Sequence, residues 1–203
     1  SDEAEKYSAA AFATKHEDAI YFSKRVTRAV PDNGPIEAHT DLVKKLDYEC
    51  ELAVVLGRDA RDVPAGQTRD YIFGYTILND VSARDVQTAH KQWYFGKSLD
   101  GFTPIGPCIV TADAFADYPP RLGIRSFVNG EKRQDSNTAL QIFDIDHVIA
   151  ELSQGMTLKA GTIIATGTPA GVGMGMDPPQ FLKPGDVVRC EIDGIGTLTN
   201  PVK

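Results

Sequence analysis

One stretch decides how this chain folds: Asp47-Tyr48-Glu49-Cys50-Glu51-Leu52-Ala53-Val54-Val55-Leu56. Its second half is an unbroken apolar run, which predicts a buried strand over 48–56. Its first half alternates between acidic and other residues, and residues two apart on a strand point to the same face. Glu49 and Glu51 are therefore predicted to project together, while Cys50 and Leu52 face the other way.

Similar runs outward from this stretch predict further strands, at 71–79, 105–111, 124–129, 162–166 and 187–192. Asn129-Gly130 and Asp193-Gly194 both predict type I′ hairpin turns, because these residues tolerate positive φ.

Helices are expected at only two places. Apolar residues recur at helical spacing over 142–154, which Gly155 would end, and a shorter helix is predicted over 82–91. The pattern predicts a β-rich mixed α/β domain with few helices, and not a doubly wound sheet.

Composition sets broader limits. The chain has 203 residues, 42% of them apolar and 24% charged, which is typical of one globular domain. The 28 acidic and 21 basic residues give a net charge of −7, which argues against a nucleic-acid partner. No apolar run reaches the ~18 residues of a membrane span, so no membrane partner is expected. The three cysteines, Cys50, Cys108 and Cys190, predict reduced thiols, mostly core filler, in a cytoplasmic protein.

The acidic pair needs a compensating charge if it is buried: a metal ion, a basic side chain or a shared proton. The plainer alternative is a solvent-facing stripe on an edge strand. Asp80 follows the strand predicted at 71–79 and would add a third carboxylate. Three carboxylates without a cysteine or histidine cluster favour Mg²⁺, Mn²⁺ or Ca²⁺. The alternative for Asp80 is a cap on the helix at 82–91.

Two further segments are candidates for ligand contact. Lys97 lies in a Gly-flanked segment after three aromatic residues, where it could neutralise a substrate carboxylate or an enolate, or it could be an ordinary surface lysine. The Gly-rich loop 165–175 begins like a dinucleotide motif, but Met176 and Pro178-Pro179 break that pattern, so no nucleotide cofactor is expected. Its backbone N–H groups and the Thr168 hydroxyl could hold an anion, or the loop could be purely structural.

Taken together, four segments resemble the fumarylacetoacetate hydrolase family over roughly residues 46–202. They are Leu46-Asp47-Tyr48-Glu49-Cys50-Glu51-Leu52-Ala53-Val54-Val55, Gly74-Tyr75-Thr76-Ile77-Leu78-Asn79-Asp80-Val81-Ser82-Ala83-Arg84-Asp85, Gly96-Lys97-Ser98-Leu99-Asp100 and Ala165-Thr166-Gly167-Thr168-Pro169-Ala170-Gly171-Val172-Gly173. Each is weakly specific alone, but their order and spacing together are specific.

The resemblance implies a rolled, barrel-like mixed β-sheet, usually in a homodimer. It implies Mg²⁺ or Mn²⁺, with Ca²⁺ as a substitute in crystals, held by Glu49, Glu51 and Asp80. Gln87, Lys97 and Thr168 match positions around the substrate, and Lys97 is the expected catalytic residue. Residues 1–40 are expected to form an amino-terminal lid and connector, truncated relative to the family, and residues 41–203 the catalytic domain.

The family acts on small 2-oxo or β-diketo acids through a metal-bound enolate. The interpretation favoured by the resemblance is C–C bond hydrolysis of an acylpyruvate or fumarylacetoacetate type of compound. The alternatives are an oxaloacetate-type decarboxylase and a hydroxymuconate-type dienoate isomerase. An alternative of another class is an inactive metal-binding homologue with a structural or sensing role.

The sequence departs from the family near its start. The family's water-activating motif aligns with residues 2–5, where Glu3 stands in the place of the histidine, and His16 is out of register. Loss of that histidine slightly favours decarboxylation or isomerisation over hydrolysis. Gly101 replaces a threonine four residues after Lys97.

Overall fold

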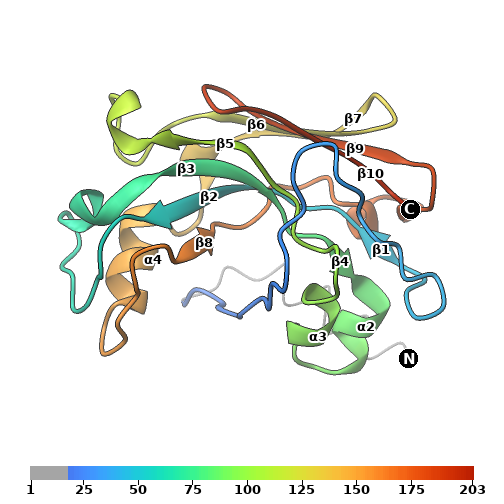
Figure 1. Ribbon diagram of the computed structural model, residues 1–203, viewed down its shortest axis with the longest axis horizontal. Coiled ribbons are helices and arrows are strands. Elements are labelled where there is room, and N and C mark those ends of the chain that lie inside the picture. Colours follow the sequence, from blue (N-terminus) through green and yellow to red (C-terminus); the bar gives the residue numbers. More distant parts are fainter. Residues whose placement is uncertain (1–17) are drawn as a thin grey trace.

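A computed structural model describes residues 18–203, which form two four-stranded sheets packed face to face (Figure 1). The strand orders are β5-β3-β2-β8 and β10-β9-β6-β7. All pairings between these strands are antiparallel, and Val30 and Ile36 add isolated parallel bridges to Pro104 and Val202. The expected β-rich mixed fold is confirmed, with three α-helices in the described part of the chain.

The first sheet is built around β2 (Cys50–Leu56), in which every residue is buried. It pairs with β3 (Ile72–Asn79) on one side and β8 (Ile163–Ala165) on the other, and β5 (Ile105–Thr111) lies beyond β3. These bounds agree with the predicted strands to within two residues. The central place of β2 follows from its apolar run, since only a strand covered on both faces can bury every side chain.

The second sheet consists of two hairpins, β6 (Gly123–Val128) with β7 (Glu131–Asn137), and β9 (Val187–Ile192) with β10 (Gly196–Pro201). Asn129 and Gly130 have φ of 52° and 84°, as a type I′ turn requires. The type I′ prediction at Asp193-Gly194 is wrong, although the hairpin exists. Gly196 pairs with Ile192, so the connection has a third residue, and of the dipeptide only Gly194 has positive φ.

The core lies between the sheets and joins Leu52 and Val54 of β2 to Val188 and Ile192 of β9. Cys50 and Cys190 belong to this core, whereas Cys108 is exposed, contrary to the core-filler expectation.

Helix α4 (Ile145–Leu152) lies inside the predicted range 142–154, because Asp144 caps it by accepting a hydrogen bond from the His147 N–H. Gly155 follows with φ of 72°. Between residues 18 and 203 the chain also forms four 3₁₀ turns: Thr68–Tyr71, Ala112–Ala114, Thr138–Leu140 and Gly173–Gly175.

A small unit next to the first sheet carries several polar side chains. Strand β1 (Leu46–Asp47) pairs with β4 (Ser82–Ala83), and the short helices α2 (Arg84–Ala89) and α3 (Tyr94–Lys97) follow. The helix predicted at 82–91 is thus shorter, because its first two residues pair with β1.

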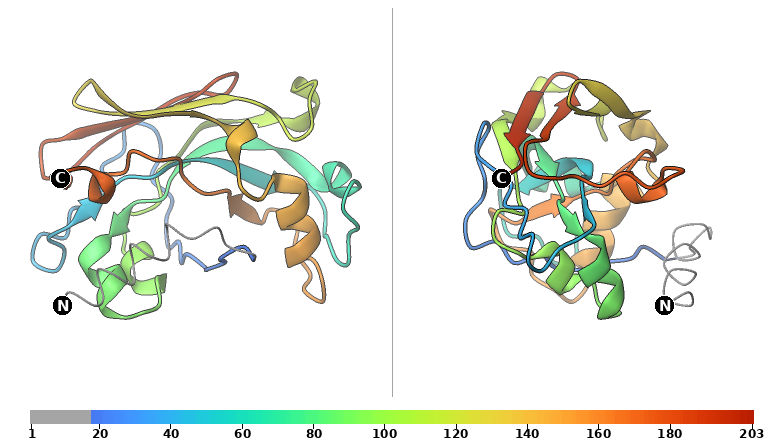
Figure 2. Two further views of the ribbon diagram at one scale, coloured as in Figure 1. Left: turned by 180° about the vertical axis from the view of Figure 1, so that it is seen from behind. Right: turned by 90° about the vertical axis from the view of Figure 1, so that its right-hand side faces the viewer.

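Residues 18–28 run beneath the first sheet, between α4 and the α2–α3 unit (Figures 1 and 2). They are fixed at both ends of this path, because the Tyr21 hydroxyl donates to Glu151 and the Arg25 N–H donates to Ser98 Oγ. The division of the chain at residue 40 stays a prediction. Among the described residues no helix is long and apolar enough to cross a membrane.

Candidate metal centre and active site

Three carboxylates meet where β2 begins and β3 ends. Cys50 pairs with Asn79 across these antiparallel strands, so Glu49, Glu51 and Asp80 come together, with one oxygen of each within 4.8 Å of the others. The predicted shared face of the two glutamates is confirmed. The edge-stripe alternative is wrong, because β2 is central and Glu51 is only 3% exposed. The cap alternative for Asp80 is also wrong, because the N-cap of α2 is Ala83.

Two lysines lie directly on this cluster. Lys97 Nζ is 2.7 Å from Glu49 Oε2 and 2.6 Å from Asp80 Oδ2. Lys24 Nζ is 2.6 Å from Asp80 Oδ1 and also donates to the Val81 carbonyl. Lys97 is 2% exposed and therefore is not a surface lysine, and its ammonium lies 5.3 Å from the centre of the Phe22 ring.

A buried arginine joins the cluster to a fourth carboxylate. Arg84 Nη1 lies 2.6 Å from Glu49 Oε1, and its Nε donates to Asp47 Oδ2 at 2.9 Å. Asp47 also accepts the backbone N–H groups of Gly173 and Met174. A Cβ at Gly173 would collide with the carbonyl of Gln180, so the close approach to Asp47 needs glycine there. This part of the Gly-rich loop thus holds an anion that the chain itself supplies.

The charges that residues 18–203 bring to this cluster nearly cancel. Asp47, Glu49, Glu51 and Asp80 face the cations Lys24, Lys97 and Arg84, which leaves one formal negative charge. Burial alone would raise the pKa of Asp80, but the two lysines beside it hold that pKa at about 2.

The pKa of Glu51 is instead raised well above its usual range, first by burial and then by repulsion from Asp80 and Glu49. Its Oε2 accepts the Gly167 N–H at 2.8 Å, and none of the basic side chains in the described part of the chain forms an ion pair with it. The residues therefore fit a divalent cation. Three hard oxygen donors lie together, and one of them is a buried carboxylate without a contacting cation.

The remaining predicted residues lie at the edge of the cluster. Gln87 is buried and accepts a hydrogen bond from Arg84 Nη1 at 3.2 Å. The Thr168 hydroxyl donates to the carbonyl of Cys50, the residue between the two glutamates, at 3.0 Å. The alignment of Glu3 and His16 lies outside the described residues.

Sequence reasoning gave no role to four residues that the structure places here: Lys24, Asp47, Arg84 and Gln134. The need for countercharge was a clue that basic residues should be sought, and Arg84 lies four residues after Asp80 on the following helix. Lys24 and Gln134 carry no such clue, because nothing in their local sequence marks them as neighbours of the cluster.

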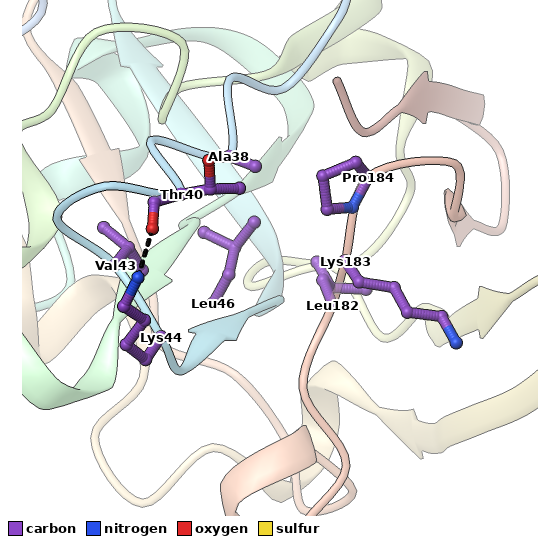
Figure 3. A pocket seen from close by; sticks show the side chains of 8 residues that line it. All are labelled: Ala38, Thr40, Val43, Lys44, Leu46, Leu182, Lys183 and Pro184. Atoms are coloured by element: carbon purple, nitrogen blue, oxygen red, sulfur yellow. Dashed lines mark hydrogen bonds between the residues drawn. The ribbon is translucent and has the colours of Figure 1, made fainter.

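Two cavities bounded by described residues lie elsewhere. One, of ≈240 Å³, opens between two segments (Figure 3). Val43 and Leu46 of the 38–46 segment line one wall, and Leu182, Lys183 and Pro184 line the other. Another, of ≈380 Å³, is lined by residues 37–42 and Lys203. None of the predicted site residues lines either cavity.

Comparison with known proteins supports one family. The model of the fumarylacetoacetate (FAA) hydrolase C-terminal family matches residues 2–203. A curated Bacillus subtilis protein, oxaloacetate tautomerase YisK, is 45% identical over 186 residues, which cover 92% of this chain and 62% of that protein. The chain thus spans about three fifths of the length of the curated relatives it matches.

Solved structures agree in both fold and sequence. A fumarylacetoacetate hydrolase from Exiguobacterium antarcticum is 48% identical with a TM-score of 0.90, covering 94% of this chain and 68% of that one. A 5-carboxymethyl-2-hydroxymuconate delta-isomerase from Mycobacterium smegmatis is 42% identical with a TM-score of 0.82, covering 92% and 70%. With this fold, these motifs and a family match over nearly its whole length, the chain belongs to the fumarylacetoacetate hydrolase family.

Proposed function

We propose that this chain forms the catalytic part of a divalent-metal-dependent enzyme that interconverts the enol and keto forms of a small 2-oxo acid. The observation that carries the proposal is the pair of lysines, half-buried Lys24 and buried Lys97, on the two oxygens of Asp80. A proton transfer next to a carbonyl needs a group that carries the proton and a positive field that stabilises the developing oxyanion. The two lysines are suited to these two tasks.

Glu49, Glu51 and Asp80 would hold the metal ion, and Mg²⁺ or Mn²⁺ suits their oxygen donors. When bound, such an ion would act as a Lewis acid toward the oxo group of the substrate.

Lys97 is assigned the electrostatic task. Its ammonium already bonds Glu49 and Asp80, which raises its pKa despite its burial and keeps it charged. A fixed charge in a buried site acts more strongly than the same charge in water, because little solvent screens it.

Lys24 is assigned the proton transfer. Its burial outweighs the attraction of Asp80 and lowers its pKa, so Nζ releases a proton more readily than a surface lysine does. In ketonisation, the Lys24 ammonium would donate a proton to the enol carbon next to the oxo group, and the resulting amine would take up the enol O–H proton. Gln87 and Thr168 are proposed to contact the substrate at the edge of the cluster.

Names of relatives support this assignment without deciding the substrate, since the chain matches only part of them. The Bacillus subtilis relative is named a tautomerase of oxaloacetate, and the Mycobacterium smegmatis structure is named an isomerase. Both names describe movement of a proton within a substrate without loss of atoms.

C–C bond hydrolysis, which the sequence favoured, is the second candidate. The Exiguobacterium antarcticum structure, at 48% identity, is named a fumarylacetoacetate hydrolase. Hydrolysis would use the same carboxylates and Lys97 but also a base that activates water, and the segment aligned with the family's base lies outside the described residues. A homodimer stays part of the proposal.

The test uses purified protein with Mg²⁺ or Mn²⁺ and a panel of enolised oxaloacetate, acylpyruvates and hydroxymuconate-type acids. Ketonisation is followed by the loss of enol absorbance over the uncatalysed rate, and products are identified by mass spectrometry. We expect ketonisation to require metal and to fall at least tenfold in Lys24→Met. Lys44→Met is the matched control, because Lys44 Nζ bonds the Thr40 carbonyl away from the site.

Two other outcomes would favour the alternative functions. Cleavage products from an acylpyruvate at a comparable rate would favour the hydrolase. Metal binding without turnover of any panel member would refute the proposal and favour an inactive homologue.

A further inference from the structure

One buried glutamine connects the second sheet to the acidic cluster. Gln134 lies on β7, is 0% exposed and reaches across to β2 and to the loop that carries Thr168. Its Oε1 accepts hydrogen bonds from the Cys50 N–H at 3.1 Å and the Ser126 hydroxyl at 2.8 Å. Its Nε2 donates to Thr168 Oγ1 and to the Pro169 carbonyl, both at 2.7 Å.

These four bonds use the full capacity of a primary amide, two donors and two acceptors. They also fix its orientation, because the Cys50 N–H can only donate and the Pro169 carbonyl can only accept. A rotated amide would face the Cys50 N–H with its NH₂ group and the Pro169 carbonyl with its oxygen. At 0% exposure, no solvent would make up for the lost bonds.

The fixed amide determines what Thr168 can offer to a ligand. Thr168 Oγ1 accepts from Gln134 and donates its own hydrogen to the Cys50 carbonyl. Its donor is therefore used within the protein, and one lone pair remains. A hydroxyl in this state accepts a hydrogen bond from an enol O–H, whereas a ligand carboxylate must turn to the N–H groups of the loop.

Gln134 Oε1 accepts from the Cys50 N–H, and the Thr168 hydroxyl donates to the Cys50 carbonyl. Both side chains thus bond the backbone of the residue that lies between the two glutamates. The Gly167 N–H, one residue before Thr168, holds Glu51. The loop, the two glutamates and Gln134 are thus connected by direct hydrogen bonds.

We propose that Gln134 is a positioning residue of the site: it anchors the Thr168–Pro169 loop against the strand of the two glutamates and makes the Thr168 hydroxyl an acceptor toward the ligand. The inference deepens the proposed function, since the ligand is the same small 2-oxo acid or its enol. Gln134 acts through Thr168 and does not itself hold metal or substrate.

The chain supplies a matched control two residues away along both the loop and β2, at Thr166 and Leu52. Gln141 Nε2 donates to Thr166 Oγ1 at 2.8 Å, and that hydroxyl donates to the Leu52 carbonyl. The chemistry is the same as for Gln134, Thr168 and Cys50. The control lies beyond the acidic cluster, and Gln141 is half-buried where Gln134 is fully buried.

The experiment compares Gln134→Met and Gln134→Glu with Gln141→Met. Mg²⁺ binding is measured by calorimetry. Oxalate, a 2-oxo acid mimic whose carboxylates would meet the N–H groups of the anchored loop, is then titrated into the protein with saturating Mg²⁺. We expect both Gln134 variants to bind oxalate at least tenfold more weakly while their Kd for Mg²⁺ changes less than threefold. Gln141→Met should keep both constants within threefold, even if its Tm falls.

Hydrogen exchange in the ligand-free proteins tests the anchoring separately. Protection of the Cys50 and Gly167 amides should fall in the Gln134 variants and not in Gln141→Met. Unchanged protection, or normal oxalate binding by the folded Gln134 variants, would overturn the inference. Wild-type protein that fails to bind oxalate with Mg²⁺ would instead count against the proposed function, and the exchange data would still decide the role of Gln134.

Discussion

Replacing Glu51 by glutamine should stabilise the metal-free protein and abolish metal binding. Within the described part of the chain, Glu51 is the carboxylate of the cluster that no cation contacts, and it accepts the Gly167 N–H. Glutamine has the same shape and can still accept this hydrogen bond through its amide oxygen. The substitution therefore removes a charge and keeps the packing.

The magnitude follows from the geometry. At 4.8 Å, with an effective dielectric constant of about 20, each neighbouring carboxylate would repel an ionised Glu51 by roughly 3.5 kcal/mol. Holding a proton on it at pH 7 costs up to about 3.7 kcal/mol, at 1.36 kcal/mol for each unit above the usual pKa of about 4.3. Glutamine carries no charge, so it avoids both the repulsion and the cost of protonation. In the wild-type protein, attraction to Lys97 already offsets part of the repulsion. We expect a gain of about 2 kcal/mol, or roughly 4–8 °C in Tm at this size.

The assay is chemical and thermal unfolding in EDTA and in Mg²⁺. Wild-type protein should gain about 2.7 kcal/mol when Mg²⁺ reaches 100 times its Kd, and Glu51→Gln should gain nothing. Because the pKa of Glu51 is raised in the folded state, its contribution to stability is lost as pH rises through that pKa. The advantage of the variant should therefore grow from about pH 4.3 upward and level off above the raised pKa.

The control is Glu37→Gln, at a carboxylate that is 58% exposed, where neither effect is expected. A Glu51→Gln protein that is less stable than wild type in EDTA would refute the charge argument. A variant that kept the Mg²⁺-induced shift would refute the metal assignment.

Three further predictions concern the same cluster. Lys97→Ala should lower kcat more than tenfold in steady-state assays, and turnover within tenfold of wild type would exclude catalysis by Lys97. Mg²⁺ binding in calorimetry should stay at least as tight, because Glu49 loses a competing cation. Arg84→Met should destabilise the protein by about 3–5 kcal/mol in urea unfolding, because Asp47 and Glu49 lose a buried partner; a loss below 1 kcal/mol would contradict this. Mg²⁺ binding at a pH below the raised pKa of Glu51 should release a proton from this residue. The release is measured as a dependence of the binding enthalpy on the ionisation enthalpy of the buffer, and the same enthalpy in every buffer would contradict the raised pKa.

The strands were largely predictable because their signals are local. The apolar run of β2 and the Asn129-Gly130 dipeptide specify their conformations through neighbouring residues alone. The short strand β4 was not predictable, because Ser82 and Ala83 are strand only by pairing with β1. The type of the second hairpin turn was missed because the extra residue in it depends on the register of β9 and β10.

The candidate site divides in the same way. The alternation of Glu49 and Glu51 fixed their common face, and the strand end at Asp80 placed the third carboxylate beside them. The ammonium of Lys24 and the amide of Gln134 reach the site from segments far away in sequence, and their neighbours in the chain do not mark them. A demand for countercharge can be derived from sequence, but the side chain that meets it depends on tertiary packing.

The site gathers groups from positions 24 to 168, and this spread governs when it can form. Lys24 meets Asp80 across 56 residues, and the Gly167 N–H meets Glu51 across 116. Contacts so distant require closure of long loops, which slows folding relative to proteins with local contacts. Cation binding therefore belongs to the end of folding and cannot nucleate it. A fragment that ended before β8 would keep all three carboxylates and both lysines yet lack the amide that orients Glu51.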